Sequence, residues 1–320
     1  MKNIYIFCPA NTVTGGPELL HQLNFRLNLL GYKSKMKYVG EIKELSPVAD
    51  RYRIYNPDYV DYVEDLKENC IIVPEIYTNE LKKYKNAQKI IWWLSVDNYF
   101  VNKNTIKYKL KSLNGLRDFN FKNNYVIHLA QSKYAIEFLK KNKVDDSKIF
   151  YLSDYLNDKF IENSLNNFNK KKKNQVLYNP KKGFEFTKKL IEKGKDIKWI
   201  PLINLSIDEM SELMQTSKVY IDFGNHPGKD RIPREAAISG CCIITGTRGS
   251  AKYYEDIAID DKYKFNDINE NIDNILSKIR NIFDNYKVVN KEFNQYRLKI
   301  MEEKNIFEND VKSIFNTIIK

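Results

Sequence analysis

The chain has 320 residues, 42% hydrophobic and 13% aromatic, which is enough apolar material for a packed core and excludes an intrinsically disordered chain. This length usually gives two domains. The net charge of +12 suits an anionic partner, whether nucleic acid, membrane surface or phosphorylated substrate, and does not choose among them. No apolar run reaches the roughly 18 residues of a membrane-spanning helix, and no signal-peptide pattern precedes the first predicted strand, so we expect a cytoplasmic protein.

Short apolar runs alternate with segments of helical period in the first half of the chain. This alternation is typical of βαβ units and a parallel sheet. A helix is predicted over 18–30, because leucines recur on one of its faces and Gly31 follows as a left-handed cap. The predicted strands are 4–8, 35–39, 71–74, 89–95, 125–130 and 148–152.

A polar stretch over 157–174 separates the two halves. It has no apolar period and ends in lysines, so we interpret it as a solvated linker. The alternation then resumes, which indicates a second Rossmann-like unit, and the tail over 269–320 is helical in period. The later predicted elements are strands over 175–178, 198–203, 219–223 and 242–245 and helices over 184–192, 206–215 and 234–239.

The cysteines and histidines show no metal-binding pattern. The cysteines lie in apolar strand-like segments without CxxC spacing, so we expect buried thiols. The histidines are too widely spaced for a metal signature, and His128, inside an apolar strand pattern, is expected to be a core residue. No metal and no cofactor are therefore predicted. The residues concerned are Cys8, Cys70, Cys241, Cys242, His21, His128 and His226.

A glycine pair follows the first predicted strand. Gly15 and Gly16 lie directly before the first predicted helix, where backbone N–H groups can approach a ligand and the helix N-terminus offers partial positive charge. A phosphate or sugar hydroxyl could bind there; the alternative is a tight loop without a ligand. The spacing matches neither GxGxxG nor GxxxxGK[ST], which argues against dinucleotide binding and P-loop hydrolysis.

The segment 219–257 carries the strongest functional signal. It predicts a strand, a polar loop, a short helix, a second strand and a second glycine loop, so both loops follow adjacent strands at the edge where open α/β sheets bind ligands. Basic side chains there could neutralise a diphosphate. Glu235, in the first turn of the predicted helix, could accept ribose hydroxyls or be an ordinary helix-start carboxylate. The other candidate ligand-binding residues are His226, Gly228, Lys229, Arg231, Arg248, Gly249 and Ser250.

The run 233–244, Pro-Arg-Glu-Ala-Ala-Ile-Ser-Gly-Cys-Cys-Ile-Ile, resembles the Pro-x-x-Glu-Ala-x-Ala-x-Gly-x-Pro-Val-Ile block of the group-one family of retaining GT-B glycosyltransferases. Three weaker similarities keep the family's order: the glycine pair, the run 130–134 and the run 179–184. The resemblance implies a GT-B fold, α/β with two Rossmann-like domains facing a cleft. It implies an N-terminal acceptor domain (1–160), a nucleotide-sugar donor domain (161–295) and a C-terminal helix (296–320) that crosses back to the N-terminal domain.

The resemblance also implies roles for single residues. Glu235 would bind the nucleotide ribose and Lys182 the donor diphosphate, with the glycine pair against the phosphates; Asp97 lies where the family often has a catalytic or sugar-contacting residue. The reaction implied is a metal-independent transfer with retention, in which basic side chains and helix dipoles stabilise the leaving diphosphate. Two departures affect the donor sugar: Pro227 replaces an acidic residue, and 175–181 lacks the usual arginine.

We therefore expect a glycosyltransferase that uses a nucleoside-diphosphate sugar and a glycan or lipid-linked acceptor in surface polysaccharide or glycolipid assembly. The basic segment 103–122, from Lys103 to Lys122, could lie on an anionic inner membrane face or be a solvated helix. The alternatives are a basic nucleic-acid-binding protein, a nucleotide-sugar epimerase of the same architecture and a degenerate binding subunit. No nucleic acid partner is expected, because no RNA-binding or helix-turn-helix signature occurs.

Overall fold

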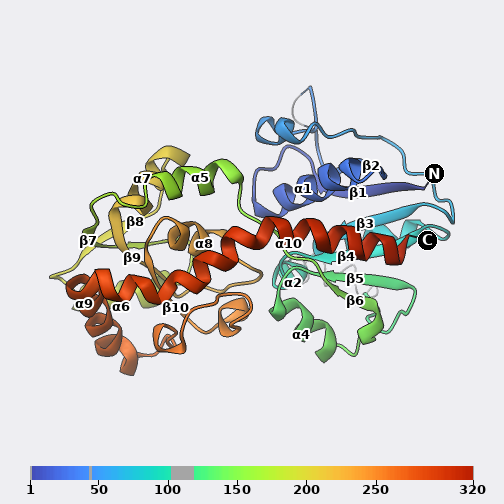
Figure 1. Cartoon of the computed structure of the whole chain (residues 1–320). Coiled ribbons are helices and arrows are strands. Elements are labelled where there is room, and N and C mark those ends of the chain that lie inside the picture. The colour runs from blue at the N-terminus through green and yellow to red at the C-terminus, as the bar shows by residue number, and fades with distance from the viewer. Residues whose placement is uncertain (1, 43–44, 102–118, 320) are drawn as a thin grey trace. The chain divides into compact units, whose positions relative to one another are not determined.

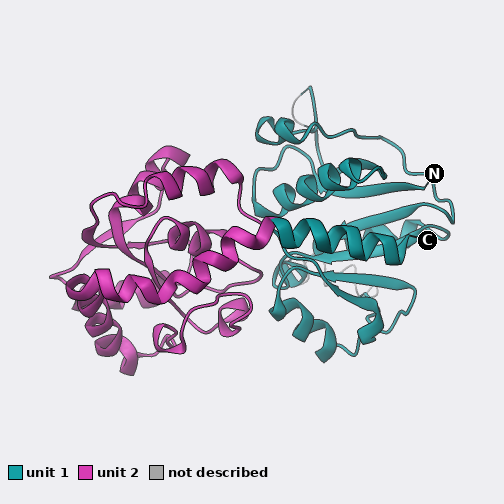
Figure 2. Ribbon diagram, viewed as in Figure 1, with its two compact units in different colours: residues 1–154, 305–320 teal, residues 155–304 magenta. Residues whose placement is uncertain are grey.

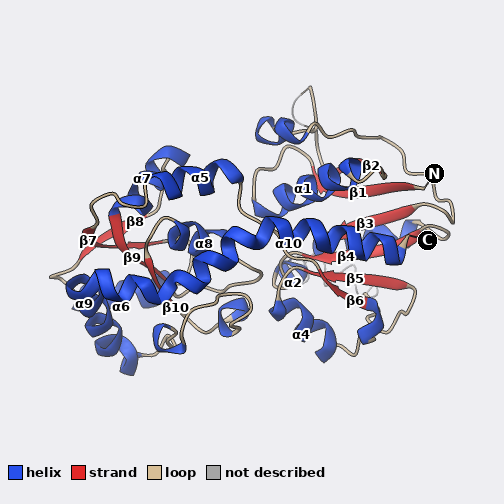
Figure 3. Ribbon diagram, in the orientation of Figure 1, coloured by secondary structure: helices blue, strands red, loops and turns tan. Residues whose placement is uncertain are grey.

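The computed structural model describes residues 2–42, 45–101 and 119–319. The chain divides into two compact units, unit 1 with residues 1–154 and 305–320 and unit 2 with residues 155–304 (Figure 2). Helices and parallel strands alternate along both units (Figure 3), so the predicted α/β class is confirmed.

The described part of unit 1 contains one six-stranded sheet in the order β2-β1-β3-β4-β5-β6, and every neighbouring pair is parallel. Isoleucine, valine and aromatic residues dominate these strands, as expected for a sheet buried on both faces. The strand order reverses between β1 and β3, which are therefore the strands where a doubly wound sheet binds ligands. The strands are β1 (Asn3–Pro9), β2 (Lys33–Val39), β3 (Cys70–Pro74), β4 (Gln88–Trp93), β5 (Val126–Ala130) and β6 (Ile149–Tyr151).

The first helix of unit 1 packs through its leucines, as predicted. It begins at Gly15, three residues before the predicted start, and Gly31 beyond its end has a φ of 85°, the left-handed conformation expected of its cap. The described helices of unit 1 are α1 (Gly15–Leu29), α2 (Asn98–Val101) and α4 (Lys133–Lys141), with 3-10 turns η1 (Asp50–Tyr55), η2 (Glu75–Lys83) and η4 (Asp146–Lys148).

Unit 2, all of whose residues 155–304 are described, contains a four-stranded parallel sheet in the order β10-β9-β7-β8. Its order reverses between β7 and β9. The strands are β7 (Lys173–Tyr178), β8 (Lys198–Pro201), β9 (Ser217–Asp222) and β10 (Cys242–Thr245). The helices are α5 (Asp158–Asn166), α6 (Phe184–Lys193), α7 (Ile207–Thr216), α8 (Arg231–Ile238) and α9 (Ile272–Val289), with 3-10 turns η5 (Gly249–Lys252), η6 (Asp261–Tyr263), η7 (Asn269–Asn271) and η8 (Asn290–Phe293).

The predicted solvated linker over 157–174 is wrong. This stretch forms α5 and the start of β7. Asn157 caps the helix, since its side chain accepts a hydrogen bond from the Lys159 N–H at 3.0 Å. The buried Ser164 hydroxyl lies 3.0 Å from that of Ser239. Because the buried position 164 carries a hydrogen-bonded serine and not an apolar residue, the sequence of this helix shows no regular apolar period.

One long helix, α10 (Asn294–Ile318), is the last element of the chain (Figure 1). Its residues up to 304 belong to unit 2 and those from 305 onward to unit 1. In unit 1, Phe307 stacks on Trp92 with ring centroids 6.5 Å apart, and Glu308 pairs with Arg26 at 2.7 Å. The buried face of the helix consists of Tyr296, Arg297, Ile300, Glu303, Phe307, Val311, Ile314 and Phe315.

Other predictions concern buried and membrane-facing groups. All four cysteines are buried free thiols, as predicted. His128 is a core residue: burial lowers its pKa to about 4, and its Nδ1 accepts the Trp93 indole N–H at 3.0 Å. No helix among the described residues is long and apolar enough to cross a membrane. The part 103–118 of the basic segment lies outside the described residues, so its membrane role stays a prediction.

Candidate functional site

Two polar loops meet at the point where the strand order of unit 2 reverses. β7 leads into the loop 179–183, which carries Lys182, and β9 leads into the loop 223–230, which carries His226. Because β7 and β9 are parallel neighbours, both loops leave the same edge of the sheet, where doubly wound folds bind ligands. The loop after β10 lies at this edge as well, since β10 pairs with β9.

Backbone packing fixes Lys182 beside the second loop. A Cβ atom at Gly183, whose φ is 60°, would lie 2.4 Å from the carbonyl carbon and oxygen of Phe223. A Cβ atom at Gly224 would lie 2.5 Å from the Cβ of Lys182. Only glycine allows this approach at both positions, so the sequence of the loops brings Lys182 to its place.

The loop after β10 supports the loop 223–230. Gly249 has a φ of 61°, and a Cβ atom there would lie 2.1 Å from the carbonyl oxygen of His226. The Ser250 N–H donates to that oxygen at 2.8 Å, and the Ser250 hydroxyl donates to the Gly228 carbonyl at 2.6 Å. Arg248 donates to the Phe223 carbonyl at 2.5 Å and pairs with an aspartate, Asp267, at 3.0 Å. Arg248, Gly249 and Ser250, which were predicted to contact a ligand, thus support the loop 223–230.

Helix α8 begins earlier than predicted, and this changes the position of Glu235. The helix runs from Arg231, with Asp230 in extended conformation at its N-cap, and Pro233 is its third residue, where no backbone N–H is needed. Glu235 therefore lies in the second turn, so the interpretation as a helix-start carboxylate is wrong. It is 7% exposed, and its Oε1 is 3.4 Å from Nη2 of Arg231.

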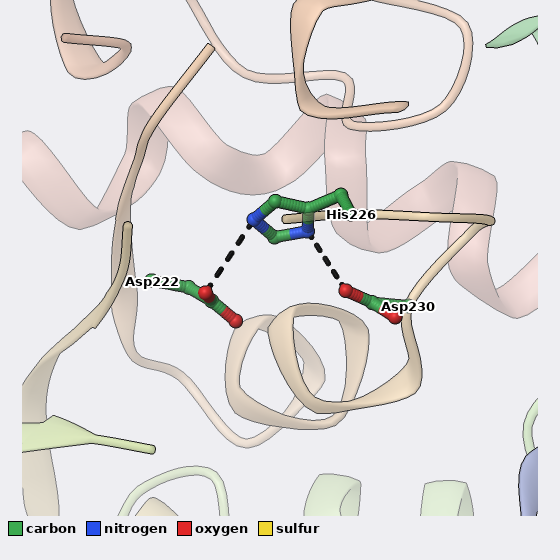
Figure 4. A group of neighbouring side chains, drawn as sticks. All are labelled: Asp222, His226 and Asp230. Carbon is green, nitrogen blue, oxygen red and sulfur yellow. Dashed lines mark ion pairs between the residues drawn. The ribbon is translucent and has the colours of Figure 1, made fainter. Parts of the chain in front are cut away.

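Five polar side chains form a partly buried series at the end of β9, in which Lys182 is 32% exposed. His226, fully buried, lies between two carboxylates: its Nδ1 is 2.9 Å from Asp230 Oδ2 and its Nε2 is 3.5 Å from Asp222 Oδ1 (Figure 4). The Asp230 oxygen is also 2.8 Å from Nζ of Lys182. At the other end, the Tyr220 hydroxyl donates to Asp222 at 2.9 Å. The shorter contact, that with Asp230, therefore combines hydrogen bonding with charge attraction, whereas Asp222 acts on His226 through its charge.

The carboxylates favour an imidazolium at His226. Burial alone would lower the pKa of His226, but the hydrogen bond and charge of Asp230 and the charge of Asp222 outweigh it and raise that pKa above its usual value. Burial likewise opposes the Asp230 carboxylate, yet His226 and Lys182 hold the pKa of Asp230 below its usual range. Both pKa shifts favour the charged pair, an imidazolium at His226 beside a carboxylate at Asp230.

These three residues could also be considered as metal ligands, because one donor atom from each of Asp222, His226 and Asp230 lies within 4.8 Å of the others. Two observations instead favour neutralisation of the two carboxylates by neighbouring side chains, without a metal ion. The two carboxylates face different nitrogens of the ring, which one ion cannot join (Figure 4). The Lys182 ammonium already contacts the Asp230 oxygen that a metal would need. Two cations and two carboxylates leave no net charge for a metal to balance.

A second buried charge cluster ties the loop 223–230 to α10. Glu303, on that helix, is 2.7 Å from Nζ of Lys229 and 2.7 Å from Nη1 of Arg234. Arg234, fully buried, also donates to the Lys229 carbonyl at 3.1 Å. The sequence analysis assigned Lys229 to a diphosphate and did not identify Arg234 or Glu303. A contact between residues 69 positions apart leaves no local signal.

The predicted site residues of unit 1 lie at its own sheet edge. Gly15 and Gly16 begin α1 directly after the β1 loop, and a Cβ atom at Gly16 would make only an ordinary contact, 3.7 Å from Leu94. Asp97 accepts a hydrogen bond from the Tyr134 hydroxyl at 3.1 Å. Sequence analysis missed Glu75, which follows β3; burial raises its pKa to about 7, and the Leu94 N–H donates to it at 3.0 Å.

No protein-family model matches the sequence, and no curated protein sequence matches it significantly. Solved structures do match. S. aureus TarM has a TM-score of 0.53 at 16% identity over 79% of this chain and 56% of its own, so the present chain spans just over half of TarM. Sucrose-phosphate synthase from Thermosynechococcus elongatus gives 0.62 at 12% identity over 99% of both chains. Anabaena HepE, in complex with UDP-glucose, gives 0.60 at 7% identity over 99% of this chain and 100% of its own. At these identities the likeness shows the fold, and the predicted GT-B fold is confirmed.

Proposed function

We propose that this chain is a glycosyltransferase that binds a nucleoside-diphosphate sugar in unit 2 and transfers the sugar to a glycan or lipid-linked acceptor. One observation carries the proposal: in a GT-B fold, the reversal point of the unit 2 sheet gathers Lys182, Arg231 and Glu235 around the start of α8. TarM has been solved with UDP and HepE with UDP-glucose, which supports this donor class.

Each of these groups has a role that its chemistry allows. The Glu235 carboxylate can accept hydrogen bonds from both hydroxyls of a ribose. Lys182 and Arg231 can neutralise the diphosphate, and the N-terminus of α8 adds partial positive charge. As the sugar leaves, negative charge accumulates on the diphosphate, and these fixed cations would stabilise it without a metal. Transfer with retention, and a sugar-contacting role for Asp97, stay predictions from the resemblance.

The first test is nucleotide binding by the wild type and by Glu235→Ala. We expect one of UDP, GDP, CDP, ADP and dTDP to raise the unfolding temperature, because a ligand that binds only the folded state stabilises it. Each hydrogen bond to a charged acceptor contributes about 1.5–3 kcal/mol, so the loss of even one of them in Glu235→Ala should weaken binding by about tenfold to about 150-fold. Calorimetric titration provides the dissociation constants. Glu235→Gln, which keeps the side-chain volume, separates loss of charge from a packing defect, and the exposed Glu270→Ala serves as control.

Catalysis distinguishes the remaining functions. Incubation of the full chain with the corresponding nucleotide sugar, followed by mass spectrometry and NMR, should show transfer to an added glycan acceptor. Conversion of the sugar without an acceptor would instead identify an epimerase. Binding of oligonucleotides with a steep salt dependence, together with no response to any of the five diphosphates, would replace the proposal with a nucleic-acid-binding function.

A further inference from the structure

The partly buried series of polar side chains that ends at Lys182 affects how a ligand can bind this lysine. Lys182 does not project freely into solvent; its ammonium is held by Asp230 at 2.8 Å. A diphosphate that recruits Lys182 must therefore compete with this carboxylate. When Lys182 leaves, Asp230, whose side chain is 18% exposed, keeps His226 as the cation beside it, because Nδ1 of His226 lies 2.9 Å from the same oxygen.

We propose that His226 is a positioning residue for the diphosphate: as an imidazolium it compensates the charge of Asp230 and so releases Lys182 to the ligand. This inference rests on the proposed function, because it takes the diphosphate of the donor as the group that Lys182 binds. With a neutral histidine, Asp230 would retain Lys182 and repel the diphosphate. When His226 is an imidazolium, its positive charge compensates the negative charge of Asp230, and Lys182 is no longer needed for this.

The surroundings of His226 contain the charges that this exchange requires. Asp222 faces its other nitrogen and holds the ring in place, and the Gly224 N–H and the Tyr220 hydroxyl fix Asp222 at 2.9 Å each. The Asp230 side chain does not cap α8 by a hydrogen bond. Its carboxylate instead contacts His226 and Lys182. The titratable and charged groups on the elements around His226 are Tyr220, Asp222, Asp230, Lys182, Arg231, Glu235, Lys229, Arg234 and Glu303.

The direction of the pH dependence follows from the raised pKa of His226. The imidazolium is present below that pKa and is lost as the pH rises through it. Affinity for a diphosphate should therefore be highest on the acidic side and decline above the pKa of His226, by up to about tenfold per pH unit. A terminal phosphate loses its last proton near pH 6, so measurements from about pH 6.5 upward separate the two titrations.

The test is calorimetric titration of UDP between about pH 6.5 and 9 with the wild type, His226→Gln and the double variant His226→Gln/Asp230→Asn, and with GDP, CDP, ADP and dTDP if UDP does not bind. His226→Gln should bind about tenfold or more weakly at neutral pH and lose the decline at higher pH. The double variant should recover most of that affinity, because it also removes the carboxylate that retains Lys182. A merely structural role of His226 predicts no such rescue.

The outcomes separate this inference from the function on which it rests. A wild-type affinity that does not change with pH, or a double variant as weak as His226→Gln, overturns the role of His226 while Glu235-dependent binding preserves the proposed function. Absence of binding by all five diphosphates overturns both. NMR provides a check without ligand: of the three histidines, His21 and His128 have lowered pKa values, so only His226 should titrate above the usual range.

Discussion

Single glycines decide whether the loops at the reversal point of unit 2 can approach one another. Gly249→Ala would place a Cβ atom 2.1 Å from the His226 carbonyl oxygen, at a φ of 61°. A left-handed alanine costs about 1–2 kcal/mol before any clash, and the loop must also move. We expect a loss of about 2 kcal/mol or more in the free energy of unfolding, together with weaker diphosphate binding, measured by denaturant titration and calorimetry.

The matched control for this variant is Gly246→Ala in the same loop. A Cβ atom there would lie 3.5 Å from Cα of Phe223, an ordinary contact, and Gly246 has no positive φ. This variant should change the free energy of unfolding by less than about 1 kcal/mol. Equal effects of the two substitutions would contradict the backbone contact with His226 as the reason for glycine at position 249.

At the scale of elements, one carboxylate joins α8 and its preceding loop to α10. Glu303 lies 2.7 Å from both Lys229 and Arg234, and all three side chains are at least nine-tenths buried. Glu303→Gln would leave two buried cations without their counter-charge, and breaking a buried pair in this way costs about 3–5 kcal/mol. We expect a loss of that size in chemical denaturation of unit 2.

The neighbouring Glu302, which is exposed on the same helix, provides the comparison. Glu302→Gln makes the same chemical change without leaving a buried charge, so it should change the free energy of unfolding by less than about 0.5 kcal/mol. If Glu303→Gln proved equally mild, water or another group would have to compensate the two cations, and the link between α8 and α10 would carry little energy.

At the scale of the whole molecule, α10 belongs to both units. Its residues from 305 onward cluster with unit 1, where Phe307 stacks on Trp92. Deleting residues 305–320 should therefore destabilise unit 1 by several kcal/mol, since each large apolar side chain contributes about 1.5–3 kcal/mol on burial. Hydrogen exchange should show faster exchange in β1 and β4 than in β7 and β9.

Two point variants make this prediction sharper. Phe307→Ala removes a buried ring and should cost about 3–5 kcal/mol. Ile306→Ala removes an adjacent side chain that is 44% exposed and should have a much smaller effect. Unchanged exchange in unit 1 after the deletion and after Phe307→Ala would count against a stabilising role of α10 there.

The sequence by itself determined the strands, most helices and the fold class, because these depend on local periodicity, turn residues and apolar content. It also indicated the GT-B fold and the loops at the ends of β9 and β10. It failed at 157–174, where the buried Ser164 interrupts the apolar face of α5, and at the start of α8, where charged residues precede Pro233 and are typical of a loop. Local patterns cannot show which polar side chains the core satisfies.

Only the tertiary structure decided how the site is assembled. The order β10-β9-β7-β8 brings Lys182 beside a loop some 40 residues further along the chain, and no spacing rule predicts that neighbour. The same packing places His226 between Asp222 and Asp230 and turns Lys229 toward Glu303. The energy of a charge pair in a core depends on the distance between the charges and on their burial, because a low dielectric strengthens the attraction. Local sequence patterns predict neither the distance nor the burial.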